Sequence, residues 1–436
     1  MRIRNLLEID YILLFTSLVL SIFGILFIYS SGVTSSGVLV SNEYIRQIIW
    51  AIAGMAIACS LSLIDYKRIR DLSIYLYLGT LFLLLYTCFF GRLVNGARAW
   101  IGIGAFGIQP SEFAKITTIL FLARHLDDTR RTTEVFSRFA VSCVIVFIPM
   151  GIILIQPDFG TSLVFIPILL VMTFVAGVTL RYVIFLIACI GLTVILTVLP
   201  LWQSYILRSN AGSFLILLNL RFIMTVILAL ALIAGIAFFG YIKYRKAYFF
   251  WILYAAGTAI ISLGASFMSH RVLKDYQIMR LIVFLDPNVD PRGAGWNIIQ
   301  SITAIGSGGF TGKGYLHGTQ SHYRFLPQQS TDFIFSIFTE EWGFLGGLLV
   351  FALFLIICLR LIRIMRTTND AFGANICAGL SGMYIFHFLI NVGMTMGIMP
   401  ITGIPLLFMS YGGSALISAM TGIGLALSIY VRRYGH

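Results

Sequence analysis

Charged side chains are scarce in this sequence. Asp, Glu, Lys and Arg together make up 11% of the 436 residues, whereas hydrophobic residues make up 59%. Soluble domains average about a quarter charged residues and about half apolar ones, so this composition excludes an ordinary soluble domain. Apolar runs of about 20 residues recur along the chain, which is the length that a helix needs to cross a bilayer. The sequence therefore predicts an all-α polytopic membrane protein.

Disulfide and metal-ligand patterns are also missing. The six cysteines fall inside apolar runs without CxxC spacing, so we interpret them as small buried hydrophobic residues. His, Cys and carboxylate residues form no cluster with ligand spacing. The net charge of +13 comes from short basic clusters between apolar runs, as membrane topology requires, and we expect no nucleic-acid partner.

Twelve apolar runs are candidate membrane spans. A cytoplasmic N-terminus would place more than half of the 30 basic residues on the cytoplasmic side, so the positive-inside rule favours both termini in the cytoplasm. The segments 91–111, 204–213 and 269–333 then lie outside. The runs are at about 10–31, 44–64, 72–90, 112–126, 139–156, 160–179, 182–203, 214–240, 248–268, 334–360, 372–398 and 404–430.

The segment 269–333 is much longer than an ordinary connection, and long loops in compact proteins are often functional. Its apolar stretches 278–285 and 296–305 are too short to span a bilayer, so we expect re-entrant or interfacial helices. A glycine-rich polar stretch follows and brings Asp332 to the edge of a span. That carboxylate is either the N-cap of the next helix or a general base.

Six motifs in this chain closely resemble those of the RodA/FtsW family of shape, elongation, division and sporulation proteins. The resemblance covers about residues 95–420, and GKGYLHGTQ is closer to the RodA branch. The motifs are NGARAWIGI (95–103), QPSEFAK (109–115), QPDFGTS (156–162), GWNIIQSITAIGSGGFTGKGY (295–315), TDFIFSIFTEEWG (331–343) and GIPLLFMSYGGSA (403–415).

The resemblance implies a peptidoglycan glycosyltransferase of the bacterial inner membrane that polymerises lipid II during cell-wall elongation. It also implies a class B penicillin-binding protein as partner and a core of ten spans. Three long apolar runs stand where that core has one, so we interpret 204–268 as a two-span insertion in a single membrane domain, 1–436. The segment 269–333 would be its large catalytic loop outside the membrane.

Asp332 is the predicted catalytic base, and the TDFIF match favours this role over capping. Transfer from an undecaprenyl-pyrophosphate-linked donor has a good leaving group, so one base and nearby cations would suffice. A glycosidase instead needs two carboxylates no more than about 10 Å apart. Glu340 and Glu341 lie about 12 Å or more along the same helix, which makes hydrolysis the weaker hypothesis.

Three ionisable residues in the first half are predicted to bind substrate. Glu112 and Lys115 have the i, i+3 spacing of an ion pair, which would be either a structural pair or a polar group of the central cavity that the resemblance implies. Asp158 lies at the outer end of a span and either turns the chain or reaches the cavity, including as a metal ligand together with Asp332.

Five further residues complete the predicted substrate-binding set. Arg98 and Trp100 precede a span and are either interfacial anchors or part of the cavity rim. Lys313 and Arg324 flank the glycine-rich stretch, which is either a backbone cradle for pyrophosphate or a tight turn. Glu340 would line the same cavity as Asp332 or pair with a neighbouring cation.

A divalent cation, Mg or Mn, on the pyrophosphate is chemically sensible, with Asp332 as a candidate ligand. We expect no nucleotide, because the glycine-rich stretch lacks the GxxxxGK[ST] order. The other expected partners are lipid II, its undecaprenyl-pyrophosphate-linked glycan and membrane lipid. Two alternatives to the transferase are a flippase for lipid-linked precursors and a non-catalytic scaffold of the cell-wall machinery.

Overall fold

The computed structural model describes residues 9–94, 97–102, 107–131, 133–207, 213–272 and 275–434. The chain forms two compact units. Unit 1 comprises Met1–Val178 and Gln300–His436, and unit 2 comprises Thr179–Ile299. Among the described residues, ten helices are long and apolar enough to cross a membrane, which confirms the predicted all-α polytopic membrane fold.

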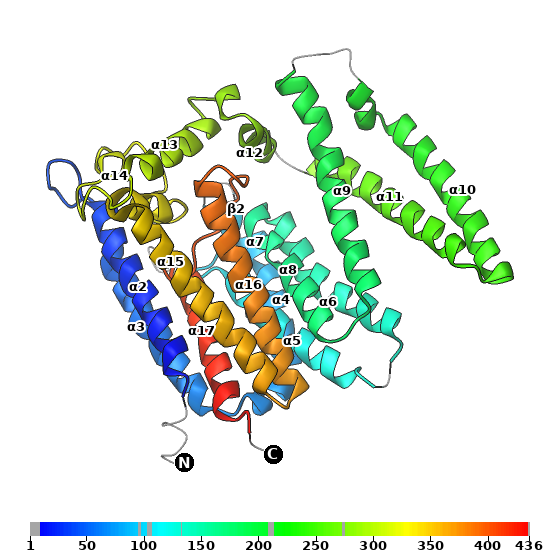
Figure 1. Cartoon of the computed structure of the whole chain (residues 1–436), viewed down its shortest axis with the longest axis horizontal. Helices are drawn as coiled ribbons and strands as arrows, with labels where there is room; N and C mark the ends of the chain where they lie inside the picture. The colour runs from blue at the N-terminus through cyan, green and yellow to red at the C-terminus, as the bar shows by residue number, and fades with distance from the viewer. Residues whose placement is uncertain are drawn as a thin grey trace. The chain divides into compact units, whose positions relative to one another are not determined.

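Unit 1 is built from long antiparallel helices and one small hairpin (Figure 1). The short helix α13 (Ala294–Ser307) begins in unit 2 and continues into unit 1. The other elements of unit 1 are α2 (Tyr11–Gly32), α3 (Glu43–Leu63), α4 (Tyr66–Phe90), β1 (Arg92–Val94), β2 (Ala97–Trp100), α5 (Pro110–Asp128), α6 (Val135–Ile155), α7 (Phe159–Leu163), α8 (Phe165–Val175), α14 (Thr319–His322), α15 (Ile334–Thr367), α16 (Ala371–Thr395) and α17 (Gly413–Val431).

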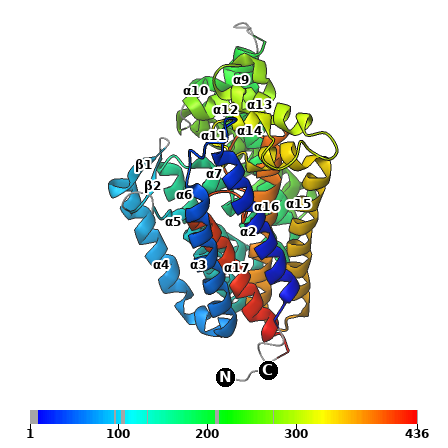
Figure 2. The same ribbon diagram turned by 90° about the vertical axis from the view of Figure 1, so that its left-hand side faces the viewer.

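Helices α16 and α17 form the buried centre of unit 1. Helix α17 packs against α3 and α5, whereas α16 packs against α5, α8 and α15 (Figure 2). Both helices are rich in Gly, Ala and Ser, and small residues let helix backbones approach closely where lipid gives no hydrophobic drive for association. Polar side chains from several helices can therefore meet at the centre of the unit.

Three of the twelve predicted spans differ from the structure. The run 112–126 lies in α5, which is not among the ten helices that qualify as spans. The run 160–179 folds as two short helices, α7 and α8, because Pro167 lacks the N–H that would continue the helical hydrogen bonds across the break. The run 404–430 becomes helical only at Gly413, and residues 404–412 form an extended and turning segment instead. Polar backbone is thus brought deep into unit 1 just before α17.

Other predicted elements are helical. Helix α5 begins at Pro110, within the motif QPSEFAK, with Pro at the first turn. The stretches 278–285 and 296–305 fall within α12 (Asp275–Leu285) and α13. The hairpin of β1 and β2 was not predicted, and it pairs Leu93 with Arg98.

The glycine-rich stretch packs against a break in α15 at Gly343, where the backbone is not helical (φ 65°). Backbone N–H groups of Lys313 and Gly314 donate to the carbonyls of Glu340 and Glu341, at 3.1 and 2.9 Å. A Cβ at Gly312 (φ 84°) would collide with the Glu341 backbone. The loop therefore satisfies backbone groups that the break leaves open, which favours the tight-turn alternative over a phosphate cradle.

Unit 2 is a set of apolar helices. Its elements are α9 (Leu180–Tyr205), η1 (Ser213–Leu218), α10 (Leu220–Tyr244), α11 (Ala247–Val272), α12 and η2 (Pro287–Val289). Helix α11 packs against both α9 and α10. Between α9 and α11, Thr197 Oγ1 donates to Ser266 Oγ at 3.2 Å. The predicted insertion 204–268 lies within this unit and supplies α10 and nearly all of α11.

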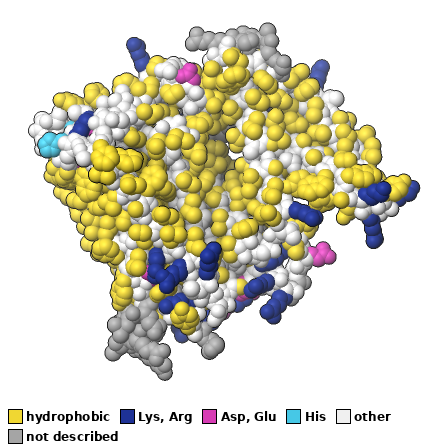
Figure 3. All heavy atoms as spheres, in the orientation of Figure 1, with side chains coloured by type: hydrophobic (Ala, Val, Ile, Leu, Met, Phe, Trp, Pro, Cys, Tyr) yellow, Lys and Arg dark blue, Asp and Glu magenta, His cyan; other side chains and the backbone are white. Residues whose placement is uncertain are grey.

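Basic side chains gather at one end of unit 1. Figure 3 shows Lys and Arg at the end where α2 begins and α17 ends, below a surface that is mostly hydrophobic. Helix α15 runs toward this end, so Asp332, which precedes α15, lies at the opposite end of the unit. This separation agrees with the topology predicted from the sequence.

Candidate functional site

Asp332 lies in a turn that leads into α15. Its N–H donates to the Gln328 carbonyl at 3.1 Å, and its own carbonyl accepts from Asn391 Nδ2 at 3.0 Å. The N-cap of α15 is Phe333, one residue later, so Asp332 does not occupy the capping position. The side chain of Asp332 is half-buried, in the turn that Asn391 of α16 holds in place.

The segment just before Asp332 is fixed from two other elements. Ser330 Oγ donates to Glu43 Oε2 of α3 at 2.6 Å, and the Tyr411 N–H donates to the Ser330 carbonyl at 2.8 Å. Tyr411 is in turn next to Ser410, whose carbonyl accepts from the buried Gln47 of α3 at 3.1 Å. The SYGGS stretch (410–414) is thereby tied to the turn that carries Asp332.

Helix α5 contributes a buried ion pair. Lys115 Nζ lies 2.7 Å from Glu112 Oε2, and their side chains are 1% and 4% exposed. Lys115 Nζ also lies 3.1 Å from Nε2 of His387 on α16. Burying a lysine and a glutamate is favourable only when further hydrogen bonds accompany the pair. The predicted pair is therefore present, and it is joined to α16 by a residue that sequence reasoning missed.

Helix α16 connects the two predicted sites. His387 meets Lys115 of α5, and Asn391 meets the backbone of Asp332 and, at 2.8 Å, the carbonyl of Ile404. His387 and Asn391 are four residues apart, so they lie on one helix face about 6 Å apart along the axis. One face of α16 thus brings the QPSEFAK and TDFIF motifs into the same region.

Asp158 joins this region through α5. Gln109 Nε2 donates to Asp158 Oδ2 at 2.8 Å, and Thr161 donates to Asp158 through both Oγ1 and N–H, at 2.8 and 3.2 Å. Asp158 is the N-cap of α7, which is the turn role that was one of its two alternatives. Burial raises the pKa of Asp158, and the hydrogen bonds from Thr161 oppose this shift.

Glu340 and Lys313 belong to a second cluster around the break in α15. Glu340 is fully buried, and its Oε1 accepts from Lys313 Nζ and the Thr319 N–H at 2.8 Å and from the Gln320 N–H at 2.9 Å. The adjacent Glu341 accepts from Ser30 Oγ and, at 3.0 Å, from the Leu316 N–H. Of the two alternatives for Glu340, the structure shows the pairing with a neighbouring cation.

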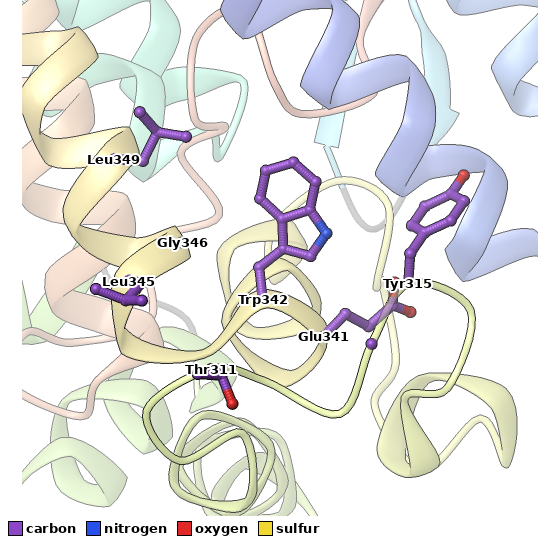
Figure 4. Close-up of a pocket in the computed structure, with 8 residues that line it drawn as sticks. Thr311, Tyr315, Glu341, Trp342, Leu345, Gly346 and Leu349 are labelled. Carbon is purple, nitrogen blue, oxygen red and sulfur yellow. The ribbon is translucent and has the colours of Figure 1, made fainter.

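A pocket of about 420 Å³ lies beside the second cluster (Figure 4). Glu341, Trp342 and Tyr315 surround it, and Leu345 and Leu349 extend it along α15. Its lining contains neither Asp332 nor Lys115. The pocket is thus a feature of the break in α15, separate from the region that α16 organises.

The remaining predicted residues lie at the surface. Arg98 is exposed on β2, and Trp100 is partly buried on the same strand. Arg324 is exposed in the loop after α14 and has a left-handed backbone (φ 57°). Among the described residues, no group of three or more His, Cys, Asp or Glu is arranged to hold a metal ion.

Comparison with known proteins decides the family. The family model FtsW/RodA/SpoVE, described as cell cycle protein, matches residues 10–219 and 205–435. The chain belongs to this family. The two matched segments cover almost all of it, including every motif named above.

Relatives of the FtsW/RodA/SpoVE chain match over nearly full length. It is 52% identical over 433 residues to peptidoglycan glycosyltransferase RodA of Treponema pallidum (strain Nichols), covering 99% of this chain and 100% of the relative. It is 31% identical over 426 residues to peptidoglycan glycosyltransferase MrdB of Escherichia coli (strain K12), covering 98% and 94%.

A solved structure shares the fold. It comes from a peptidoglycan synthase complex whose polymerization and crosslinking are structurally coordinated. The TM-score is 0.65 at 26% identity, over 98% of this chain and 99% of that one.

His387 and Asn391 are the main residues of this family member that motif reasoning did not single out. A signal was available, because a His and an Asn four residues apart in an apolar span are expensive to bury without partners. Their partners, however, are 272 and 59 residues away in sequence. Only the packing of α16 against α5 and the α15 turn shows what they bind.

Proposed function

We propose that the protein is a peptidoglycan glycosyltransferase that polymerises lipid II, with Asp332 as general base. The observation that carries the proposal is the convergence on α16, where His387 meets Lys115 and Asn391 meets the Asp332 backbone. A base and a buried cation in one region are what transfer from a lipid pyrophosphate requires. The names of the full-length relatives support the same reaction.

In the proposed reaction, an acceptor hydroxyl attacks the anomeric carbon of the donor sugar. Asp332 accepts the hydroxyl proton as the new glycosidic bond forms. The bond from the anomeric carbon to the pyrophosphate oxygen breaks, and undecaprenyl pyrophosphate leaves with the electron pair. Lys115 stabilises the negative charge that develops on this leaving group.

Arg98, Trp100 and Arg324 are proposed to bind the substrate at the surface, because they are at least partly exposed. Lys313 and Glu340 are assigned to the fold instead, since they satisfy one another and the loop backbone. The described residues do not form a metal site of their own. A Mg or Mn ion would rely mainly on pyrophosphate oxygens, and no step proposed here depends on it.

The proposed setting is the bacterial inner membrane, with both termini in the cytoplasm and Asp332 outside. The proposed partner is a class B penicillin-binding protein, which the likeness to a chain of a peptidoglycan synthase complex supports. The high identity to a relative named RodA supports a role in elongation.

The test is polymerisation of lipid II by purified protein with its penicillin-binding partner. Wild type is expected to form glycan strands, and Asp332→Asn, which keeps the shape and removes the base, is expected to lose about 10²–10⁴-fold in rate. Equal strand formation by a folded Asp332→Asn protein would remove Asp332 from the mechanism. Vesicle translocation of lipid II by both proteins without any polymer would favour the flippase.

A further inference from the structure

His387 is a buried histidine whose two ring nitrogens both have partners. Nδ1 lies 3.1 Å from the carbonyl oxygen of Pro405, and Nε2 lies 3.1 Å from Lys115 Nζ. A carbonyl oxygen can only accept a hydrogen bond, so the Nδ1 position carries the proton. The Lys115 ammonium can only donate, so Nε2 accepts. These partners together assign His387 as a neutral imidazole with one defined tautomer.

The position of the Lys115 ammonium follows from this arrangement. An ammonium has three N–H donors on a flexible four-carbon stem. Its nitrogen lies 2.7 Å from Glu112 Oε2, in an ion pair, and 3.1 Å from His387 Nε2, which belongs to a different helix. These two contacts together fix where the ammonium lies, whereas Glu112 alone would leave it free to rotate about a single contact.

We infer that His387 is a positioning residue that holds the Lys115 ammonium for a diphosphate oxygen of the lipid substrate. The inference rests on the proposed function, because it assigns Lys115 to the leaving group. His387 itself touches no reacting atom in this scheme. It acts through Lys115, and its neutral state is essential, since a protonated ring would place a second cation 3.1 Å from the first.

The surroundings of His387 define how acid would act on it. Lys115 of α5 faces its Nε2, and Glu112 of the same helix pairs with Lys115. Helices α8 and α17 contain no charged residue. A proton added to Nε2 would remove the acceptor for Lys115.

Substituting His387 by glutamine or by phenylalanine distinguishes a role in positioning Lys115 from a role in packing alone. The glutamine amide oxygen can accept from Lys115 while its NH₂ donates to Pro405, so it reproduces both hydrogen bonds and does not titrate. Phenylalanine fills similar space and provides neither. The matched control is Tyr384→Phe on the same helix, which deletes one buried hydrogen bond, from Tyr384 Oη to the Ala419 carbonyl at 2.7 Å, away from Lys115.

The experiment measures lipid II polymerisation for wild type, His387→Gln, His387→Phe and Tyr384→Phe, with thermal unfolding of each purified protein. His387→Phe is expected to lose at least about tenfold in turnover, more than Tyr384→Phe at equal folded fraction. His387→Gln is expected to stay within about threefold of wild type, because its amide restores both hydrogen bonds.

Two outcomes would decide against the inference. It fails if folded His387→Phe matches wild type, or if folded His387→Gln loses as much turnover as is expected of His387→Phe. If His387→Phe does not fold, the turnover of His387→Gln alone decides. Absence of polymer from wild type would instead refute the proposed function, which keeps the two failures distinct.

Discussion

Unit 1 contains two lysine–carboxylate pairs that differ in their surroundings: both partners are buried in the pair of Lys115 and Glu112, whereas Lys313 is 25% exposed beside the fully buried Glu340. Glu340 receives Lys313 and several N–H groups of one loop, so its acceptor positions are filled from residues 313–321. Lys115 contacts one carboxylate, of Glu112 on its own helix, and one neutral imidazole, of His387 on α16. The pair of Glu340 and Lys313 stabilises the break in α15. The pair of Glu112 and Lys115 instead leaves an N–H of the buried ammonium available for a substrate oxygen. Burial of charge alone therefore does not identify a functional site.

The largest expected effect comes from removing the pair of Glu112 and Lys115 entirely. Glu112→Gln combined with Lys115→Met deletes both charges, so neither partner is left buried and uncompensated. Turnover is expected to fall at least about 10²-fold, because the charge on the leaving group loses its stabiliser. Polymerisation and thermal unfolding are measured together. Full activity in this protein would show that Lys115 serves the fold.

The next effect is on stability. Glu340→Leu leaves Lys313 and the N–H groups of Thr319 and Gln320 without their buried acceptor, and is expected to cost about 3–5 kcal/mol. Thermal unfolding in detergent measures this change. Glu340→Gln is the control, since its amide oxygen still accepts. An unchanged melting temperature for Glu340→Leu would mean that the loop does not depend on this carboxylate.

The smallest effect concerns the turn before Asp332. Ser330→Ala removes the hydrogen bond to Glu43 but keeps the backbone contact with Tyr411. We expect a loss of about 1 kcal/mol in stability and a few-fold decrease in turnover. Thr331→Val, which alters the neighbouring exposed hydroxyl, is the comparison in both assays. Equal values for the two variants would show that the Glu43 contact does not help to place Asp332.

The sequence predicted the membrane helices well because each helix must satisfy its backbone internally, which leaves a local signature of about 20 apolar residues. It failed at 404–412, which is equally apolar but is held in a non-helical path by contacts such as that of Asn391 with Ile404. The apolar composition of residues 404–412 indicates that they are buried, but it does not determine whether their backbone is helical.

The candidate site was predicted only in part. Glu112 and Lys115 are three residues apart, so their ion pair could be inferred from helical spacing. The links of Lys115 to His387 and of Asp332 to Asn391 depend on tertiary packing, which no local pattern contains. The same holds for Glu340, whose partner Lys313 lies 27 residues earlier in a loop.

The most direct test compares two double variants in one polymerisation assay, each lacking the charges of one lysine–glutamate pair. One protein carries Glu112→Gln with Lys115→Met, and the other carries Lys313→Met with Glu340→Gln. At equal folded amounts, we expect the first to lose at least about 10²-fold in turnover and the second to stay within about threefold of wild type. Loss of activity in the second protein with full activity in the first would contradict the account.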